Sequence, residues 1–198
     1  MADARNTTLR YGTVAMALHW LIALGVIANI CLGLYFADMP NSDPAKFGLA
    51  QTHKSIGLTV LVLSLLRAAW RLMNPVPPLP RGMSRALRRL ARASHVLLYI
   101  LIVLIPLTGW LMVSASPLGI PTHYFGLFNW PDIPFFTDMT LAQKHVVRDN
   151  FGAAHVILAW SAIVLVPIHI AGALYHQFLR GDDVLRRMLP GTNVTDPA

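Results

Sequence analysis

Four long stretches of the chain consist almost entirely of apolar residues, and segments rich in charge, polar residues or proline separate them. They cover roughly residues 14–37, 51–72, 94–114 and 151–178. A helix needs about 20 mostly apolar residues to cross the hydrocarbon core of a bilayer, and each stretch reaches that length. The pattern therefore predicts an all-α fold, an integral membrane four-helix bundle that forms a single domain over residues 1–198.

Two prolines, Pro106 and Pro167, lie inside the third and fourth predicted spans. A proline cannot donate its backbone hydrogen bond, which ends many helices in water. Inside a membrane, neighbouring helices and side chains can satisfy the carbonyl that the proline frees. We therefore expect both prolines to bend their helices without ending them.

Lysine and arginine are distributed unevenly between the two ends of the predicted spans. Four lie on one side, namely Lys46, Lys54, Lys144 and Arg148. Twelve lie on the other side, namely Arg5, Arg10, Arg67, Arg71, Arg81, Arg85, Arg88, Arg89, Arg92, Arg180, Arg186 and Arg187. Because cytoplasmic segments carry the excess of positive charge, both termini are predicted to be cytoplasmic. The long connection between the third and fourth spans (residues 115–150, the outer connection) is predicted to lie outside.

The net charge of +7 is thus explained by membrane topology rather than by nucleic-acid binding, and the sequence contains no nucleic-acid-binding motif. Within the cytoplasmic excess, arginine alternates with leucine over residues 81–92. This alternation predicts a surface helix that lies on anionic lipid. Membrane lipid is therefore one expected partner, and nucleic acid is not.

The remaining composition excludes several kinds of chemistry. All nine acidic residues are aspartate, so paired-carboxylate hydrolysis and carboxylate-rich metal sites are not expected. A single cysteine, Cys31, cannot form an internal disulfide, an iron–sulfur cluster or a covalent Cys-x-x-Cys-His heme attachment. It lies in an apolar run and is expected to be a small buried residue.

Among the histidines of the predicted spans, four lie at two matched depths. His53 and His155 lie near the outer ends of their spans, whereas His19 and His169 lie toward the cytoplasmic ends. The 14 residues between His155 and His169 correspond to a rise of about 21 Å and return the side chain to within about 40° of its first direction. The sequence therefore predicts an outer pair, His53/His155, and an inner pair, His19/His169.

Two histidines that face each other across an apolar bundle are suited to bind a six-coordinate b-type heme. Zinc fits less well, because a closed zinc site needs four ligands at one point. A lone histidine in a membrane helix is more often a hydrogen-bonded bundle residue, but two pairs at matched depths favour ligands. With both axial positions filled, the expected chemistry is electron transfer.

The other four histidines receive different interpretations. His95 begins the third span, and it either contacts the inner heme or a quinone or is a simple interfacial residue. His176 lies seven residues beyond His169, which places it at the cytoplasmic interface. His123 and His145 belong to the outer connection and are expected to be solvated. No role is assigned to His176.

Several segments resemble the bacterial cytochrome b-561 family. They are YGTVAMALHW (11–20), QTHKSIG (51–57), RAAWRLMNPVPPLP (67–80), SHVLLY (94–99), the pair His155 and His169, and DVLRRMLP (183–190). The resemblance covers about residues 5–190. It implies two b hemes in the bacterial inner membrane, with axial ligands that match His19, His53, His155 and His169. At least one member of the family is similar to a superoxide oxidase, which passes electrons from periplasmic superoxide to ubiquinone.

The resemblance therefore leads us to expect an oxidoreductase of the superoxide:quinone type, with ubiquinone as the electron acceptor. Lys54, Lys144 and Arg148 lie close in sequence to the outer ligands, where they can attract a small anion. Their alternative interpretation is ordinary interfacial charge, and three outer aspartates, Asp132, Asp138 and Asp149, oppose the attraction.

Two alternatives stay open. In the first, the chain is a heme-bearing membrane anchor that relays electrons for a periplasmic partner, as in hydrogenase- or dehydrogenase-type complexes. In the second, it is a structural or transport bundle without heme. The sequence alone does not identify the physiological donor or the quinone site.

Overall fold

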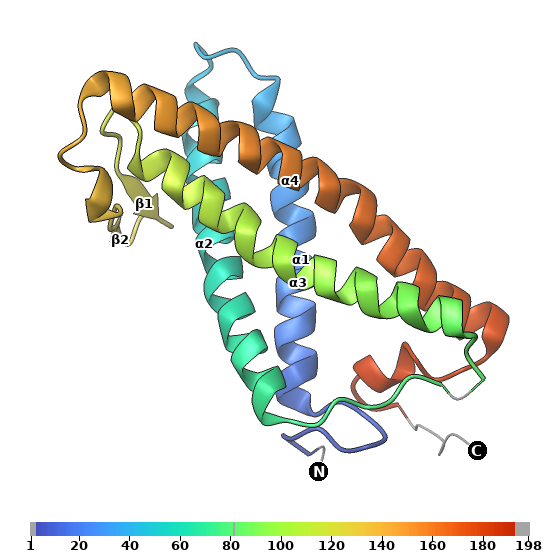
Figure 1. Cartoon of the computed structure of the whole chain (residues 1–198). Coiled ribbons are helices and arrows are strands. Elements are labelled where there is room, and N and C mark those ends of the chain that lie inside the picture. The colour runs from blue at the N-terminus through green and yellow to red at the C-terminus, as the bar shows by residue number, and fades with distance from the viewer. Residues whose placement is uncertain (1–2, 81, 193–198) are drawn as a thin grey trace. The chain divides into compact units, whose positions relative to one another are not determined.

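The computed structural model describes residues 3–80 and 82–192, and Arg81 of the predicted surface helix lies outside the described residues. Four helices make up most of the chain (Figure 1): α1 (Thr13–Ala37), α2 (Pro44–Met73), α3 (Arg85–Ser114) and α4 (Leu141–Tyr175). Each is long and apolar enough to cross a membrane. The prediction of four spans in an all-α fold is confirmed.

Three helices begin earlier than the apolar pattern predicted. α2 begins at Pro44, α3 at Arg85 and α4 at Leu141, which is about two to three turns before the apolar stretches. Hydropathy detects only the segment inside the hydrocarbon core, whereas backbone hydrogen bonds continue the helix into the polar region beyond it. The prediction of a separate surface helix over residues 81–92 is wrong, because residues 85–92 form the first turns of α3.

Pro106 and Pro167 lie inside α3 and α4, so neither proline ends its helix, as predicted. Cys31 differs from the prediction. Its side chain is exposed on α1, where it belongs to the apolar outer surface of a membrane helix. A small polarizable thiol is accepted on such a surface as readily as in a packed core.

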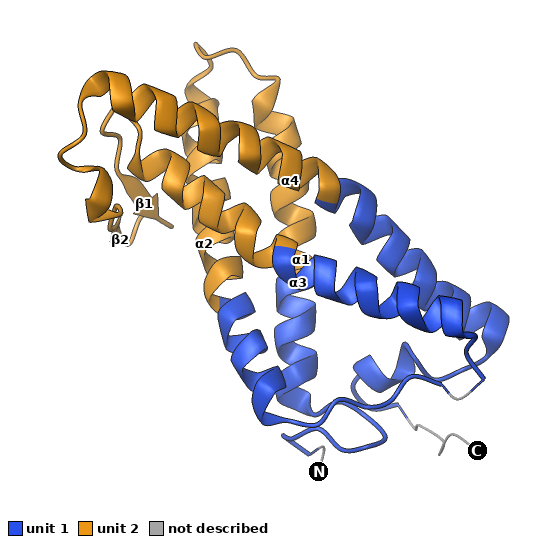
Figure 2. Ribbon diagram, in the orientation of Figure 1, with its two compact units in different colours: residues 1–22, 63–100, 162–198 blue, residues 23–62, 101–161 orange. Residues whose placement is uncertain are grey.

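The helices divide between two compact units (Figure 2). Unit 1 consists of residues 1–22, 63–100 and 162–198, and unit 2 consists of residues 23–62 and 101–161. Each of the four helices contributes one segment to each unit. His19, His95 and His169 therefore belong to unit 1, and His53 and His155 belong to unit 2.

Unit 1 holds its irregular segments together with side-chain hydrogen bonds to backbone carbonyls. The buried amide of Asn6 donates to the Pro75 carbonyl at 2.8 Å, and the buried Arg187 Nη1 donates to the Pro78 carbonyl at 2.6 Å. The Tyr11 amide donates to the Arg187 carbonyl. The proline-rich turn after α2 thus contacts both the N-terminal and C-terminal segments. Those two segments lie on the same side of unit 1, as an even number of membrane spans requires.

Unit 2 contains the outer connection, which includes regular secondary structure. Strands β1 (Thr122–Tyr124) and β2 (Phe128–Trp130) form an antiparallel hairpin. Its turn holds Phe125 and Gly126 at positive φ, 47° and 73°. Glycine adopts such angles readily and phenylalanine rarely does, so Phe125 needs support from outside the hairpin.

That support comes from three polar residues spaced one turn apart on α2. The Gln51 side chain donates to the Pro121 carbonyl and accepts from the His123 amide. The fully buried Ser55 hydroxyl accepts from the Phe125 amide at 3.0 Å, and the Thr59 hydroxyl lies 2.9 Å from that of Tyr124. This polar row fixes the hairpin on one face of α2. His53, two residues from both Gln51 and Ser55, is about 200° away around the helix.

Aromatic side chains of the hairpin form a cluster against α3. Tyr124 lies 5.1 Å from Phe128 and 5.4 Å from Trp130 between ring centroids. Trp130 also contacts Trp110 of α3, and the Trp110 indole donates to the Pro131 carbonyl at 3.1 Å. Such amphipathic rings are typical of the headgroup region of a membrane.

We predict that Ser55→Ala lowers the free energy of unfolding by about 1–3 kcal/mol, because it leaves the Phe125 amide without an acceptor in a buried position. Thr52→Ala is the matched control. Thr52 is exposed one turn away, and its hydroxyl bonds only to the Gly48 carbonyl of the same helix. Denaturant titration in detergent micelles measures both variants. Equal effects of the two substitutions would contradict the supporting role of Ser55.

Candidate functional site

The outer pair lies together in unit 2. The ring centroids of His53 on α2 and His155 on α4 are 6.1 Å apart, with an interplanar angle of 76°. Imidazole nitrogens bind a first-row metal at about 2 Å, so two rings on opposite sides of one metal have centroids about 6 Å apart. The separation of the two rings therefore fits a single six-coordinate metal between them.

The orientation of His155 leaves one ring nitrogen free for a metal. Its Nδ1 lies 2.9 Å from the Ile105 carbonyl oxygen of α3 and 3.4 Å from the Thr108 hydroxyl. A carbonyl can only accept, so Nδ1 carries the hydrogen and Nε2 has the free lone pair. A hydrogen bond of this kind on the far nitrogen is what holds a metal-binding histidine in place.

A glycine of a neighbouring helix lies against each ring of the outer pair. A Cβ atom on Gly33 of α1 would lie 3.0 Å from His53 Cε1, and one on Gly109 of α3 would lie 3.2 Å from His155 Cε1 and Nδ1. Real Cβ atoms rarely approach so closely. The rings therefore occupy space that only glycine leaves open on these two helices.

The inner pair lies together in unit 1, with a third histidine beside it. The centroids of His19 on α1 and His169 on α4 are 6.4 Å apart, at an interplanar angle of 77°. His95 of α3 lies 5.5 Å from His169. The His19/His169 separation resembles that of the outer pair, and the shorter His95/His169 separation fits a metal between the rings less well. Of the two readings that the sequence left for His95, this position favours contact with the inner site.

A spacing of 14 residues recurs on all four helices. It relates His19 to Gly33 on α1, His53 to Arg67 on α2, His95 to Gly109 on α3, and His155 to His169 on α4. One member of each couple belongs to unit 1 and the other to unit 2. We call Gly33, His53, Gly109 and His155 the outer set. We call His19, Arg67, His95 and His169 the inner set.

Two histidines mark this spacing on α4 alone, so histidines by themselves predict it only there. The signal on the other helices was present in the printed sequence, where a glycine or an arginine stands at the matching position. These residues have no chemistry in common with histidine. Only their contacts with the rings show that they belong to the same arrangement.

The other three histidines lie outside the two pairs, and His145 belongs to the first turns of α4 rather than to the outer connection in which it was predicted. His123 and His145 are exposed. His176 lies in the turn that ends α4 and forms an ion-pair contact of 2.7 Å between its Nδ1 and the Asp182 carboxylate.

The three basic residues near the outer pair differ in their surroundings. Lys54 is half-buried, lines a small pocket with Phe47, Gln51 and Ser116, and has Asp132 as its main counter-charge. Arg148 is exposed and pairs with its neighbour Asp149 at 3.0 Å. Lys54 is thus part-buried and directly follows His53 in the chain, whereas Arg148 is partly neutralised by its neighbour.

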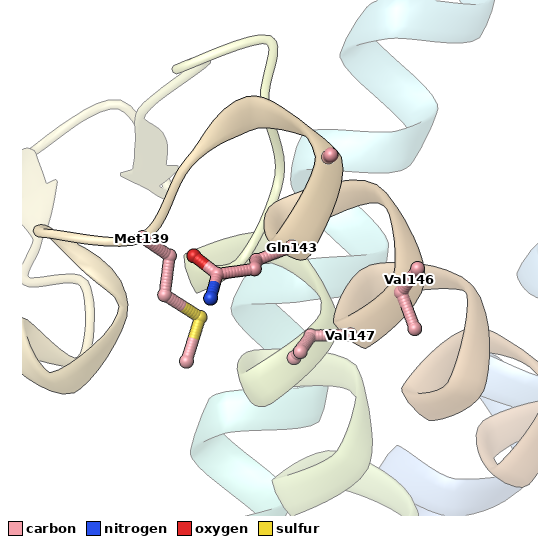
Figure 3. Close-up of a pocket in the computed structure, with 5 residues that line it drawn as sticks. Met139, Gln143, Val146 and Val147 are labelled. Atoms are coloured by element: carbon pink, nitrogen blue, oxygen red, sulfur yellow. The ribbon is translucent and has the colours of Figure 1, made fainter.

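A second, shallow pocket lies at the start of α4 and is lined by Met139, Ala142, Gln143, Val146 and Val147 (Figure 3). Its walls are apolar apart from the Gln143 amide. None of the residues that line it can bind a metal strongly or transfer a proton. The chemistry therefore belongs to the histidine pairs.

The chain is similar to bacterial membrane cytochromes. The family model described as prokaryotic cytochrome b561 matches residues 10–191. Cytochrome b561 homolog 2 of Escherichia coli K12 is 39% identical over 185 residues, covering 93% of this chain and 93% of that protein. The probable superoxide oxidase CybB of Yersinia pestis is 26% identical over 185 residues, covering 91% and 96%. Cytochrome b562 of Cereibacter sphaeroides is 29% identical over 184 residues, covering 90% and 94%.

We predict that Gly33→Val displaces the His53 ring, because a branched side chain overlaps the position of that ring, and that the substitution lowers the heme content of the protein. The measurement is the ratio of heme to protein from a pyridine hemochrome spectrum, which is expected to fall below that of the wild type. Gly48→Val is the matched control on α2, since a Cβ there meets nothing within 4 Å. Unchanged heme content in Gly33→Val would contradict the close fit of ring and glycine.

Proposed function

The chain belongs to the prokaryotic cytochrome b561 family, and we propose that it binds two b-type hemes, one at the outer pair and one at the inner pair. Family membership identifies a membrane electron-transfer protein and implies heme b. The observation that carries the assignment of ligands is the matched separation of the two histidine pairs, 6.1 Å and 6.4 Å.

When bound, each heme supplies a site that accepts and donates one electron at a time. The chain's own residues fill both axial positions, which favours electron transfer over oxygen binding. Ile105 holds the His155 ring through Nδ1, so the ring changes little between oxidation states. A rigid ligand shell of this kind lowers the structural rearrangement that each electron transfer requires.

We propose further that the protein oxidises periplasmic superoxide and passes the electrons to ubiquinone. Each superoxide loses one electron and leaves as dioxygen. Two such electrons and two protons convert one ubiquinone to ubiquinol. The similarity to the probable superoxide oxidase CybB of Yersinia pestis supports this substrate. The half-buried ammonium group of Lys54 beside His53 also supports it, because a cation near the donor site attracts a small anion.

The proposed orientation places the outer connection on the periplasmic side of the bacterial inner membrane and both termini in the cytoplasm. The uneven distribution of arginine supports it. The contact between the N-terminal and C-terminal segments in unit 1 agrees with an even number of spans. In this orientation the outer pair meets the periplasmic donor and the inner pair meets the membrane quinone pool.

A second candidate function is an electron relay for a periplasmic redox partner. Several apolar side chains of the outer connection are exposed, among them Leu118, Leu127 and Phe135. Exposed apolar patches of this kind mark protein or membrane contacts. A lone purified chain that oxidises superoxide at a high rate would exclude the need for such a partner.

We predict that His53→Ala and His19→Ala each remove one of two hemes, because an iron that loses one axial ligand is held weakly. His145→Ala is the control, since His145 is exposed. His95→Ala is expected to keep both hemes. A reduced-minus-oxidised spectrum with hemochrome quantification gives the result. Retention of two hemes in either ligand variant would contradict the assignment of that pair.

We predict that superoxide reduces the purified protein and that ubiquinone reoxidises it. Lys54→Gln should slow the reduction by about two- to five-fold and weaken its dependence on ionic strength. Lys46→Gln is the control, because Lys46 lies on the same helix and hydrogen-bonds to Met39 and Asn41 at its start. Stopped-flow absorbance measures the rates. If the protein holds two hemes that superoxide does not reduce, the result would contradict superoxide oxidation and favour an electron relay that a partner protein reduces.

A further inference from the structure

Arg67 occupies a position on α2 that the proposed function leaves without a role. It belongs to the inner set, 14 residues beyond His53. Its Nε donates to the Tyr99 hydroxyl of α3 at 3.0 Å. Its guanidinium carbon lies 5.6 Å from the Tyr99 ring centroid, and that of Arg71 lies 5.4 Å from the same centroid. Tyr99 therefore contacts two cations and fixes the direction of Arg67.

Three polar groups on the same side of α2 are buried without a hydrogen-bond partner among the described residues. They are Ser64 Oγ, Arg67 Nη1 and Trp70 Nε1. Successive members are three residues apart, so each is rotated by only about 60° from the previous one. Arg67 and Trp70 can only donate. A ligand that satisfies both must present acceptor oxygens.

Arg67 has no ion-pair partner in the part of the chain that the structure describes. None of the ion pairs formed by residues 3–80 and 82–192 includes Arg67. The guanidinium lies close enough to His19, His95 and His169 to act electrostatically on all three. A charge at this depth is costly unless an opposite charge accompanies it. The inner set thus contains an unpaired cation next to the two ligands of the inner heme.

We propose that Arg67 and Trp70 bind a propionate carboxylate of the inner heme, and that the charge of Arg67 favours the reduced state of that heme. This inference rests on the proposed function, which places a heme between His19 and His169. Carboxylate is the acidic group that a b heme brings with it, and its two oxygens accept from guanidinium and indole N–H donors.

The effect of Arg67 on the midpoint potential follows from the charge of the iron. A ferric iron with two neutral imidazoles carries one more positive charge than the ferrous form. A nearby cation disfavours the ferric form, so Arg67 raises the midpoint potential of the inner heme. The outer set holds His53 at the matching position on α2, and its four members include no cation. Lys54 follows His53 in the chain, but it has the Asp132 carboxylate as a counter-charge, whereas Arg67 has no ion-pair partner among the described residues. The 14-residue spacing therefore places an uncompensated charge within the inner set, in the direction that draws electrons toward the inner pair.

Redox titration of the purified holoprotein, with visible spectra of both hemes, tests the inference. In Arg67→Gln, the ratio of reduced to oxidised inner heme at a fixed ambient potential should fall by at least ten-fold, and the outer heme should not change. The inner heme is identified as the one absent from His19→Ala. Arg67→Lys keeps the charge and should keep most of the potential. Arg89→Gln is the charge control, because Arg89 is exposed at the start of α3.

A second readout separates carboxylate binding from a simple charge effect. A heme propionate that loses the Arg67 guanidinium within the membrane binds a proton more readily. Reduction of the iron removes one positive charge and so favours protonation of the propionate further. The inner potential of Arg67→Gln should therefore decrease with rising pH near neutrality more steeply than that of the wild type. Tyr99→Phe removes the bond to Nε without removing the charge and should give a smaller shift in the same direction.

The outcomes distinguish this inference from the proposed function. Two hemes with unchanged potentials in Arg67→Gln would overturn the inference and leave the ligand assignment intact. Unchanged potentials with a raised ubiquinone KM would overturn it too, because Arg67 would then bind quinone. If Arg67→Gln fails to fold, the potentials of Arg67→Lys and Tyr99→Phe test the inference instead. An inner-heme potential that is unchanged in Tyr99→Phe would then overturn it. Retention of two hemes in His19→Ala would refute the proposed inner site itself.

Discussion

A polar side chain at the depth of the hydrocarbon core must find its partner within the protein or in a bound group, because the lipid offers none. The arrangement of this chain follows from that constraint. His155 Nδ1 donates to the Ile105 carbonyl of α3. The same carbonyl accepts from the Thr108 hydroxyl. A threonine and a histidine from two helices thus share one carbonyl, and this contact fixes the direction of the nitrogen that is proposed to bind a metal.

The same constraint explains why the outer connection matters although it contributes no ligand. Gln51, Ser55 and Thr59 turn their polar groups toward the hairpin, where backbone amides and carbonyls are available. With that face of α2 occupied, His53 points to the other side, toward His155. The hairpin therefore sets the rotation of α2 about its axis, and the rotation sets the geometry of the outer pair. A loop outside the ligand set can control metal binding in this way.

Much of this was predictable from sequence, because apolar length and histidine spacing are properties of the chain alone. The four spans and the two pairs depend on little else. The early start of α3 at Arg85 was missed because a charged first turn lowers mean hydropathy without breaking the helix. The hairpin was missed because Phe125 at positive φ has no local signal, and its support comes from Ser55, 70 residues away. Gly33 and Gly109 were missed for the same reason, since a glycine acquires meaning only from the ring that lies against it.

The recurrence of 14 residues on four helices limits how such a protein can change over evolutionary time. Insertion of one residue between the two sets would rotate everything beyond it by about 100° and turn one set away from its partners. Seven residues are close to two turns, so only insertions near that length preserve both faces at once. The loops carry no such restriction. Length variation among natural relatives should therefore concentrate in the turns and leave the four intervals untouched, and an alignment gap inside any of them would signal the loss of one redox centre.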